Sequence, residues 1–186
     1  MRPKRIGLAA LMLTVLAASA AAAQTTHNAV EVRGGVAVPG FDFADVAKPG
    51  PTFGVGYRYN PTGGVWVMFD ADYSSQPAAD DGVKTTVVHL IGKVGIDLVD
   101  RANPFSFILN VGAGVMLFDF DRETTPFDNK TYFGSNIGAK AGYAVSRSIT
   151  IYLNAQADMA FSESSGAIPT SNAWIFPLTV GLAYGF

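Results

Sequence analysis

Apolar residues alternate with polar residues or glycine along almost the whole chain after residue 29. Val67, Phe69 and Ala71, for example, alternate with Asp70 and Asp72. A period of two is typical of β-strands with one apolar face, because successive side chains of a strand point to opposite sides. The alternation predicts eight strands, at residues 29–38, 52–59, 65–73, 85–98, 105–118, 131–143, 149–161 and 173–186.

The composition excludes several kinds of protein. The chain has no cysteine, which excludes disulfide scaffolds, thiolate metal sites and cysteine nucleophiles. A formal net charge of −2 argues against a nucleic-acid partner, because binding to phosphates needs a basic surface. Only 15% of the residues are charged, against about 25% in typical soluble domains. No cofactor is expected from these features.

The N-terminus has the pattern of a secretory signal peptide. Basic residues near the start precede an apolar, alanine-rich run that ends in an Ala-x-Ala cleavage site at residues 21–23. We therefore predict a signal peptide at residues 1–23 and one barrel domain at residues 24–186. An uncleaved membrane anchor is the alternative, because residues 6–23 are almost long enough to span a bilayer.

The connections between the predicted strands alternate in length. Short ones lie at 60–64, 99–104 and 144–148, and longer ones, rich in Asp, lie at 39–51, 74–84, 119–130 and 162–172. Short turns at one rim and longer loops at the other are typical of bacterial outer-membrane barrels. A sheet in lipid must close, because every backbone N–H and C=O needs a partner there. The sequence therefore predicts an all-β protein, an eight-stranded antiparallel transmembrane up-and-down β-barrel, exported through the periplasm to the outer membrane.

The aromatic residues on the apolar face favour a membrane barrel over two soluble alternatives. They gather near both predicted rims and leave mainly aliphatic residues between them, as in the aromatic girdles of membrane barrels. The alternatives are a soluble sandwich with an aromatic core and a lipocalin-like barrel with its apolar face inward. Glycines and charges on the opposite face, together with the signal peptide, favour the membrane barrel.

The last strand carries the most specific signal in the sequence. Its alternating apolar residues end on a phenylalanine, at Leu178, Val180, Leu182, Tyr184 and Phe186. With this ending the chain resembles the small eight-stranded outer-membrane barrels of the OmpA, OmpX and OmpW type. The resemblance implies that these five residues are the signal read by the barrel-assembly machinery. We also expect a monomer that contacts outer-membrane lipids and lipopolysaccharide, the latter bridged to acidic loop residues by divalent cations.

The polar face predicts a filled lumen. An eight-stranded barrel encloses little more than its own side chains, and buried charges persist only when they are paired. A symmetric first hairpin, with Val38 facing Pro51, would place Glu31 opposite Arg58 inside the barrel. We predict a network of ion pairs formed by Glu31, Arg33, Arg58, Asp97 and Lys140.

These features predict a structural or surface-interaction role, with a lumen plugged by polar and charged side chains. A narrow porin-like channel or a transporter of small apolar solutes is the alternative, because inward glycines such as Gly54 and Gly56 leave room. Pro177 removes an N–H from a strand that pairs on both sides, which indicates either a β-bulge or a lateral opening.

An enzymatic role is not expected. Lipid-A deacylases and palmitoyltransferases share this architecture, but they need a nucleophile with a base, or a histidine with acid and hydroxyl partners. His27 and His89 are the two histidines, and Leu90 and Ile91 follow His89, so the His-x-Ser pattern of the deacylases is absent. A lipid-A-modifying enzyme is thus the least favoured alternative, and no catalytic or metal-binding residue is predicted.

Overall fold

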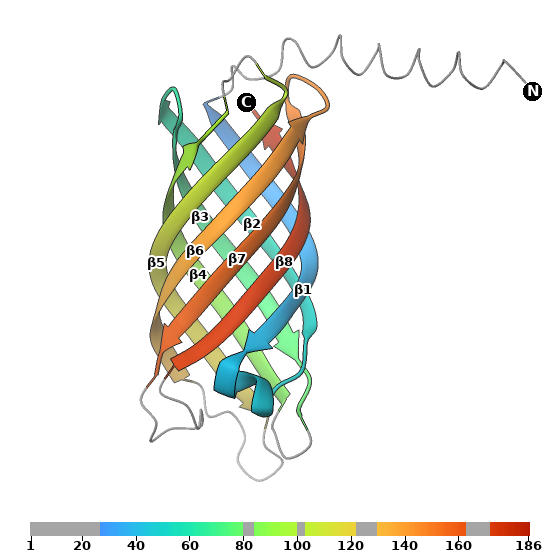
Figure 1. Ribbon diagram of the computed structural model, residues 1–186, viewed down its shortest axis with the longest axis vertical. Coiled ribbons are helices and arrows are strands. Elements are labelled where there is room, and N and C mark those ends of the chain that lie inside the picture. Colours follow the sequence, from blue (N-terminus) through green and yellow to red (C-terminus); the bar gives the residue numbers. More distant parts are fainter. Residues whose placement is uncertain (1–26, 80–83, 100–102, 122–129, 163–171) are drawn as a thin grey trace, which may run out of the picture.

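The computed structural model describes residues 27–79, 84–99, 103–121, 130–162 and 172–186. Within them, eight antiparallel strands follow one another around a closed barrel, and the last strand pairs with the first (Figure 1). The strands are β1 (Asn28–Gly40), β2 (Gly50–Thr62), β3 (Val65–Gln76), β4 (Lys84–Asp97), β5 (Phe105–Asp121), β6 (Lys130–Ala144), β7 (Ile149–Phe161) and β8 (Asn172–Gly185). The predicted fold is therefore confirmed. The predicted signal peptide, residues 1–23, lies outside the described residues.

Each strand turns its apolar face outward and its polar face into the barrel. Val55 and Ile137 are 57% and 60% exposed, whereas Glu31 and Lys140 are each only 2% exposed. An apolar surface of this extent is unfavourable in water but matches the hydrocarbon of a bilayer. The polar side chains face the barrel axis, where only other side chains can neutralise them.

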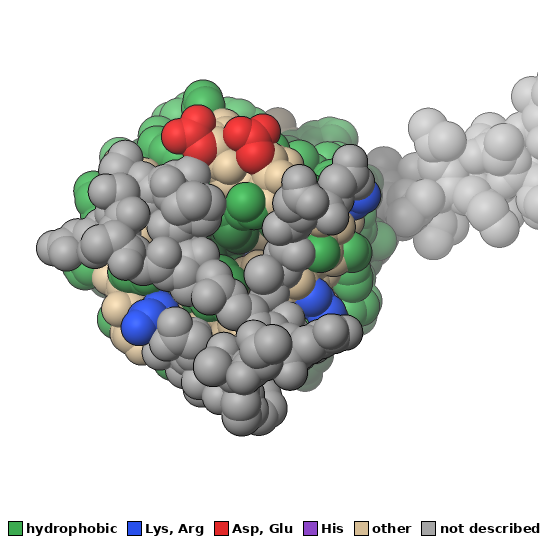
Figure 2. Space-filling model, turned by 90° about the horizontal axis from the view of Figure 1, so that it is seen from below, with side chains coloured by type: hydrophobic (Ala, Val, Ile, Leu, Met, Phe, Trp, Pro, Cys, Tyr) green, Lys and Arg blue, Asp and Glu red, His purple; other side chains and the backbone are tan. Residues whose placement is uncertain are grey.

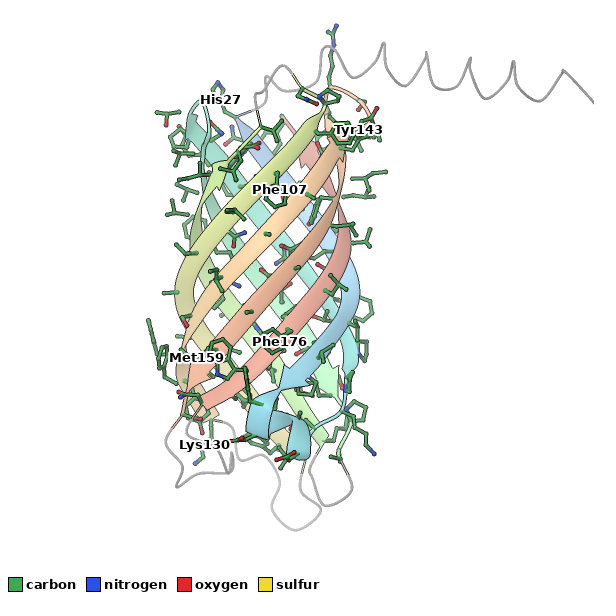
Figure 3. The ribbon with its side chains drawn as sticks, in the orientation of Figure 1. His27, Phe107, Lys130, Tyr143, Met159 and Phe176 are labelled. Carbon is green, nitrogen blue, oxygen red and sulfur yellow. The ribbon has the colours of Figure 1, made fainter. Side chains whose placement is uncertain are left out.

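The two rims differ in their connections. The short connections β2–β3, β4–β5 and β6–β7 lie at the rim that also holds residues 27 and 186, and we call this the turn rim (Figure 1). The opposite loop rim includes η1 (Phe41–Asp45), a 3-10 helix between β1 and β2. Figure 3 shows His27 and Tyr143 near the turn rim and Lys130 near the loop rim. Within the described ranges, no helix has the length and apolar character needed to cross a membrane.

Aromatic side chains of the outer surface form contacts near both rims. Near the turn rim, the ring centroids of Phe105 and Tyr143 lie 4.9 Å apart. Near the loop rim, those of Phe133 and Phe161 lie 5.7 Å apart. These pairs belong to the two groups of aromatic residues that the sequence places at opposite ends of the apolar face, as expected for interfacial girdles.

The pairing of β1 with β2 differs from the symmetric hairpin predicted above. Val36, not Val38, faces Pro51, and Glu31 faces Gly56 rather than Arg58. Beyond Ala37, β1 pairs only with β8, because the chain leaves β2 to form η1. The symmetric register assumed a simple loop, and the 3-10 helix shifts the pairing by two residues. A shift of two keeps every side chain on its predicted face.

Pro177 does not cause a β-bulge. Ala155 pairs with Leu178 and Asp158 pairs with Ile175, which is one unbroken register on both sides of the proline. The positions between them, beside Pro177, are not paired. Because proline has no N–H, the ladder between β7 and β8 is interrupted here without an inserted residue.

Candidate functional site

Arg33 on β1 is the centre of a buried group of charges in the lumen. Its Nε and Nη2 atoms donate to the two carboxylate oxygens of Asp72, each at 2.7 Å. Its Nη1 donates to Asp70 Oδ1 at 3.1 Å and lies 3.7 Å from Glu31 Oε2. A guanidinium and a carboxylate joined by two parallel hydrogen bonds form one of the strongest polar contacts in proteins. Arg33 therefore fastens β1 to β3, although β2 lies between them.

Two glycines of β2 leave the space that Arg33 occupies. A Cβ atom at Gly56 would lie 2.5 Å from Asp70 Oδ1 and 3.1 Å from Arg33 Nη1. A Cβ atom at Gly54 would collide with the Asp72 carboxylate and lie 2.9 Å from Arg33 Nε. The inward face of β2 is thus flat here, and the guanidinium crosses it to reach β3. These glycines make room for an ion pair rather than for a solute.

Besides Arg33, two further cations contact the carboxylate of Glu31. Lys140 Nζ on β6 lies 2.5 Å from Glu31 Oε2, and Arg58 Nη1 on β2 lies 3.3 Å from Oε1. Arg58 reaches Glu31 although the two residues are not directly opposed, because long side chains can contact diagonal neighbours. The structure thus brings together four predicted residues, Glu31, Arg33, Arg58 and Lys140.

Aromatic rings cover the two outer cations of this group. Lys140 Nζ lies 4.6 Å from the centroid of the Tyr152 ring, and the Arg58 guanidinium lies 4.8 Å from that of Trp66. A cation above an aromatic face is attracted by the ring quadrupole. The two rings therefore help to stabilise the buried charges of Lys140 and Arg58.

Asp97 does not join the other four residues, contrary to the prediction. Its Oδ1 accepts hydrogen bonds from the backbone N–H groups of Val99, at 3.1 Å, and Phe107, at 3.0 Å. The residue lies at the end of β4, where the chain turns toward β5. A short acidic side chain at a strand end finds unpaired backbone donors close by, and these hold Asp97 at the turn rim.

A second set of polar residues continues the network toward the loop rim. Lys93 Nζ lies 2.7 Å from Asp70 Oδ2 and also donates to Gln156. Asn136 donates to both Gln156 and Asp158, and Asp158 Oδ2 lies 2.8 Å from Nδ1 of His89. We call the connected residues the lumen network; they are Glu31, Arg33, Arg58, Asp70, Asp72, His89, Lys93, Asn136, Lys140, Gln156 and Asp158.

Apolar clusters, which we call layers, adjoin the lumen network toward both rims, and they are absent from the predictions above. The loop-side layer consists of Ala37, Phe43, Ala47, Val87, Ile91, Met116, Phe118, Phe120, Ala160, Ala173 and Ile175. The turn-side layer consists of Trp66, Met68 and Ile108. The order is visible on β5, whose inward residues run from Ile108 through Asn110 to Met116 and Phe118. A signal for the layers exists in the sequence, because these residues interrupt the polar face with apolar side chains.

The helix η1 completes the loop-side layer. Phe43 is fully buried, and its ring lies 6.1 Å from that of Phe118 in an edge-on contact. Phe41, at the start of η1, has a φ of 54°, which is unusual for a residue other than glycine, and its ring packs on Trp174 outside the barrel. Figure 2, which views this rim, shows acidic and basic side chains at its edge and hydrophobic atoms near its middle. The helix thus inserts one aromatic ring into the lumen and places another on the outer wall.

Four of the predicted assembly residues lie on the outer face of β8, and Phe186 directly follows the strand. Their exposed fractions range from 49% for Leu182 to 60% for Phe186. The Phe186 N–H donates to the Asn28 carbonyl at 3.0 Å, so the end of β8 is fixed beside the start of β1. Within the described part of the chain, no group of three or more His, Asp and Glu residues is arranged to hold a metal ion.

Comparisons with known proteins agree with this geometry. A model of the outer membrane protein beta-barrel domain family matches residues 8–186. Solved structures with a similar fold are Neisserial surface protein A (12% identity, 87% of this chain and 98% of that chain covered, TM-score 0.68), the N-terminal β-barrel domain of Pseudomonas aeruginosa OprF (14%, 87% and 100%, 0.56) and Ail, the attachment invasion locus protein of Yersinia pestis (11%, 87% and 99%, 0.59). None of the curated protein sequences compared with the chain matches it. The closed eight-stranded barrel with its apolar outer wall, and a family match over nearly the whole sequence, lead to one conclusion: this chain belongs to the outer membrane protein β-barrel domain family.

Proposed function

We propose that this protein is an integral outer-membrane barrel with a structural or surface-interaction role and a lumen that side chains plug. The observation that carries the proposal is the lumen network, which joins opposite walls of the barrel through Arg33, Glu31 and Lys140. Charges paired across a lumen resist displacement, because removing one partner leaves the other buried without compensation. The apolar layers support the same proposal, since hydrated ions do not enter apolar constrictions readily.

Conductance in planar bilayers tests the plug directly. We expect the signal-cleaved wild-type protein to give no stepwise current, while a variant with Arg33→Ala and Lys140→Ala gives a small cation-selective current through the acids that are left unpaired. An Asp97→Asn variant is the matched control, since this residue lies outside the lumen network, and it should stay silent. A steady single-channel current from the wild-type barrel contradicts the proposal and supports a narrow channel.

The partners of this protein are also part of the proposal. The apolar outer face contacts acyl chains of outer-membrane lipids, and exposed acids of η1, Asp42 and Asp45, favour lipopolysaccharide bridged by divalent cations. The apolar outer face of β8, followed by Phe186, supports recognition by the barrel-assembly machinery. Two structural neighbours are named as a surface protein and as an attachment invasion locus protein, which supports a surface-interaction role. We propose no enzymatic activity, because Asp70, Asp72 and Glu31 of the lumen network are each held by Arg33, Lys93 or Lys140.

One observation favours a second candidate, lateral access for small apolar solutes. The ladder between β7 and β8 is interrupted beside Pro177, and the loop-side apolar layer lies directly behind it, with Ala37 facing Pro177 and Ile175 on the same strand. An opening at this point would connect an apolar interior with the lipid.

Restoring the missing N–H tests lateral access. The Pro177→Ala variant can complete the ladder, so uptake of a small apolar dye into vesicles that contain the barrel should fall if the seam is a route. A Pro39→Ala variant, on the neighbouring strand, is the control for a proline change alone. Equal uptake by the wild type, both variants and empty vesicles removes this candidate.

A further inference from the structure

A groove crosses the outer wall of the barrel over four neighbouring strands, β1 to β4, and has a volume of about 660 Å³. Two rows of outward side chains border it, and the register places the members of each row directly beside one another. One row includes Ala71 and Leu90, and the other includes Tyr57, Phe69 and Gly92. The residues between the rows, such as Asp70, turn their side chains into the lumen, so their backbone forms the floor. We call this feature the outer groove.

Two small residues account for the depth of the outer groove. Gly92, which faces Phe69, has no side chain, and Ala71, which faces Leu90, has only a methyl group. A Cβ atom at Gly92 would lie 3.7 Å from Cε1 of Phe69, so the ring borders the space above the glycine. Phe69 and Leu90 are 60% and 45% exposed, and they form the higher banks. The outer groove is therefore open to the medium that surrounds the barrel.

The chemistry of the outer groove fits an apolar ligand. The backbone groups of the floor take part in the ladders that join β1 to β2, β2 to β3 and β3 to β4. The hydroxyl group of Tyr57 donates to Oδ1 of Asn28 at 2.6 Å. A polar ligand would lose its hydrogen bonds to water here and gain none from the floor. A hydrocarbon chain has no such loss and gains contacts with carbon atoms.

The dimensions of the outer groove match one lipid chain. Neighbouring strands lie about 4.8 Å apart, so a groove across four of them is about 14 Å long. This length is about half of the ~30 Å hydrocarbon core of a bilayer, which is the depth of one leaflet. The two rows are two residues apart along each strand, or about 7 Å. Because carbon atoms in contact lie about 3.5–4.0 Å apart, one chain fits between the rows and touches both.

The outer groove runs from the turn rim toward the middle of the barrel. Val30, at its β1 end, is two residues from Asn28, where β1 begins at the turn rim. Leu90 and Gly92, at its β4 end, lie near the middle of β4. The exposed hydrogen bond between Tyr57 and Asn28 lies at the end next to the rim. A lipid whose polar head lies at the turn rim can therefore place one chain in the groove.

We infer that the outer groove binds one acyl chain of a phospholipid from the leaflet at the turn rim, with the head group beside Asn28 and Tyr57. The inference rests on the proposed function, because it requires the barrel to lie in a bilayer. It goes further by assigning a fixed site on a wall that would otherwise contact all lipids alike. A chain in the groove touches carbon atoms of the floor and of both rows, whereas a chain elsewhere lies against a single surface.

Photochemical labelling from the lipid tests the outer groove. The signal-cleaved barrel is refolded in vesicles of phosphatidylethanolamine, a small fraction of which carries a diazirine in one acyl chain. After irradiation, mass spectrometry of peptides locates the adducts. We expect adducts per exposed outward residue to be about fivefold more frequent at the outer groove on β3 and β4 than on β6 and β7, a preference equivalent to about 1 kcal/mol.

Filling the outer groove provides a second measurement. Ala71→Leu together with Gly92→Leu occupies the space between the rows. The fold tolerates a side chain at residue 92, since the atoms nearest to its Cβ would be 3.7 and 3.8 Å away. The adducts on β3 and β4 should then fall about fivefold, to the level of β6 and β7. Ala155→Leu is the matched control, because this exposed outward alanine lies on β7, and it should leave the labelling of the groove unchanged.

The pattern of adducts separates the inference from the proposed function. Equal labelling of all strands in the wild type, or unchanged labelling in the filled variant, overturns the inference but leaves the barrel in the bilayer. Weaker labelling at the outer groove than elsewhere also overturns it, and indicates that a protein surface covers this wall. Adducts on none of the strands would contradict the proposed function as well, because the barrel would then not contact lipid chains.

Discussion

At the scale of single residues, the smallest side chains of the lumen decide where the largest one lies. Gly54 and Gly56 leave β2 flat, so Arg33 crosses it and binds Asp70 and Asp72. The sequence shows these glycines on the polar face but not the crossing, because an alternation pattern carries no information on contacts between strands that are not adjacent. From the pattern alone, these glycines could leave open space for a solute or relieve crowding between tightly coiled strands.

A methyl group at Gly56 should therefore destabilise the barrel. In Gly56→Ala, the new Cβ displaces the Asp70 carboxylate and the Arg33 guanidinium, and the cost should be about 1–3 kcal/mol, as for other overpacked sites. Urea unfolding of the barrel in lipid vesicles measures this loss of unfolding free energy. Gly63→Ala is the control, because nothing lies within 4 Å of a Cβ at that position in the β2–β3 turn. Equal stability of the two variants would refute the crossing.

The two acids Glu31 and Asp97 should respond very differently to loss of charge. Glu31→Gln leaves the cations of Lys140, Arg58 and Arg33 without their carboxylate, and we expect a loss of about 3–5 kcal/mol. Asp97→Asn keeps the amide oxygen that accepts the turn N–H groups, so its cost should stay below about 1 kcal/mol. The same urea titrations compare the free energies of unfolding of the two variants. Similar losses of stability would mean that Asp97 contributes to the lumen network as much as Glu31 does.

At the scale of elements, β8 combines closure of the barrel with the proposed assembly signal. Phe186→Ala and Phe105→Ala each remove a comparably exposed ring from the outer face near the turn rim. Each should lower the stability of the folded barrel by about 2 kcal/mol, from lost apolar contact. Only Phe186→Ala should also slow insertion into vesicles that contain the assembly machinery. Equal insertion rates for the two variants would remove the special role of the last residue.

The strand β1 marks the limit of prediction at this scale. Its boundaries and its two faces follow from the period of two, because burial selects one face of each strand. Its register to β2 does not, since η1 uses residues that a simple loop would leave in the ladder. The burial of Phe43, which anchors η1, depends on Phe118 from β5, a contact far away in sequence.

At the scale of the whole molecule, the sequence predicts the barrel but not the layers within it. Closure follows from the apolar outer face, since a spanning sheet cannot leave unpaired edges in lipid. The apolar layers, in contrast, depend on which inward residues of the eight tilted strands lie at the same depth in the lumen. Val87 and Met116 are two such residues, and their common position becomes visible only once the register of every pair is known.

The ion pairs of Glu31 and Arg33 require different extents of the folded sheet. Arg33 meets Asp72 within the first three strands, so this contact is available to an unfinished, open sheet. Glu31 meets Lys140 only when β1 and β6 face each other across the axis, which requires the sheet to have curled. A cross-link or fluorescent pair placed at these two positions would therefore time the rolling-up of the cylinder, separately from the zipping of its neighbouring strands.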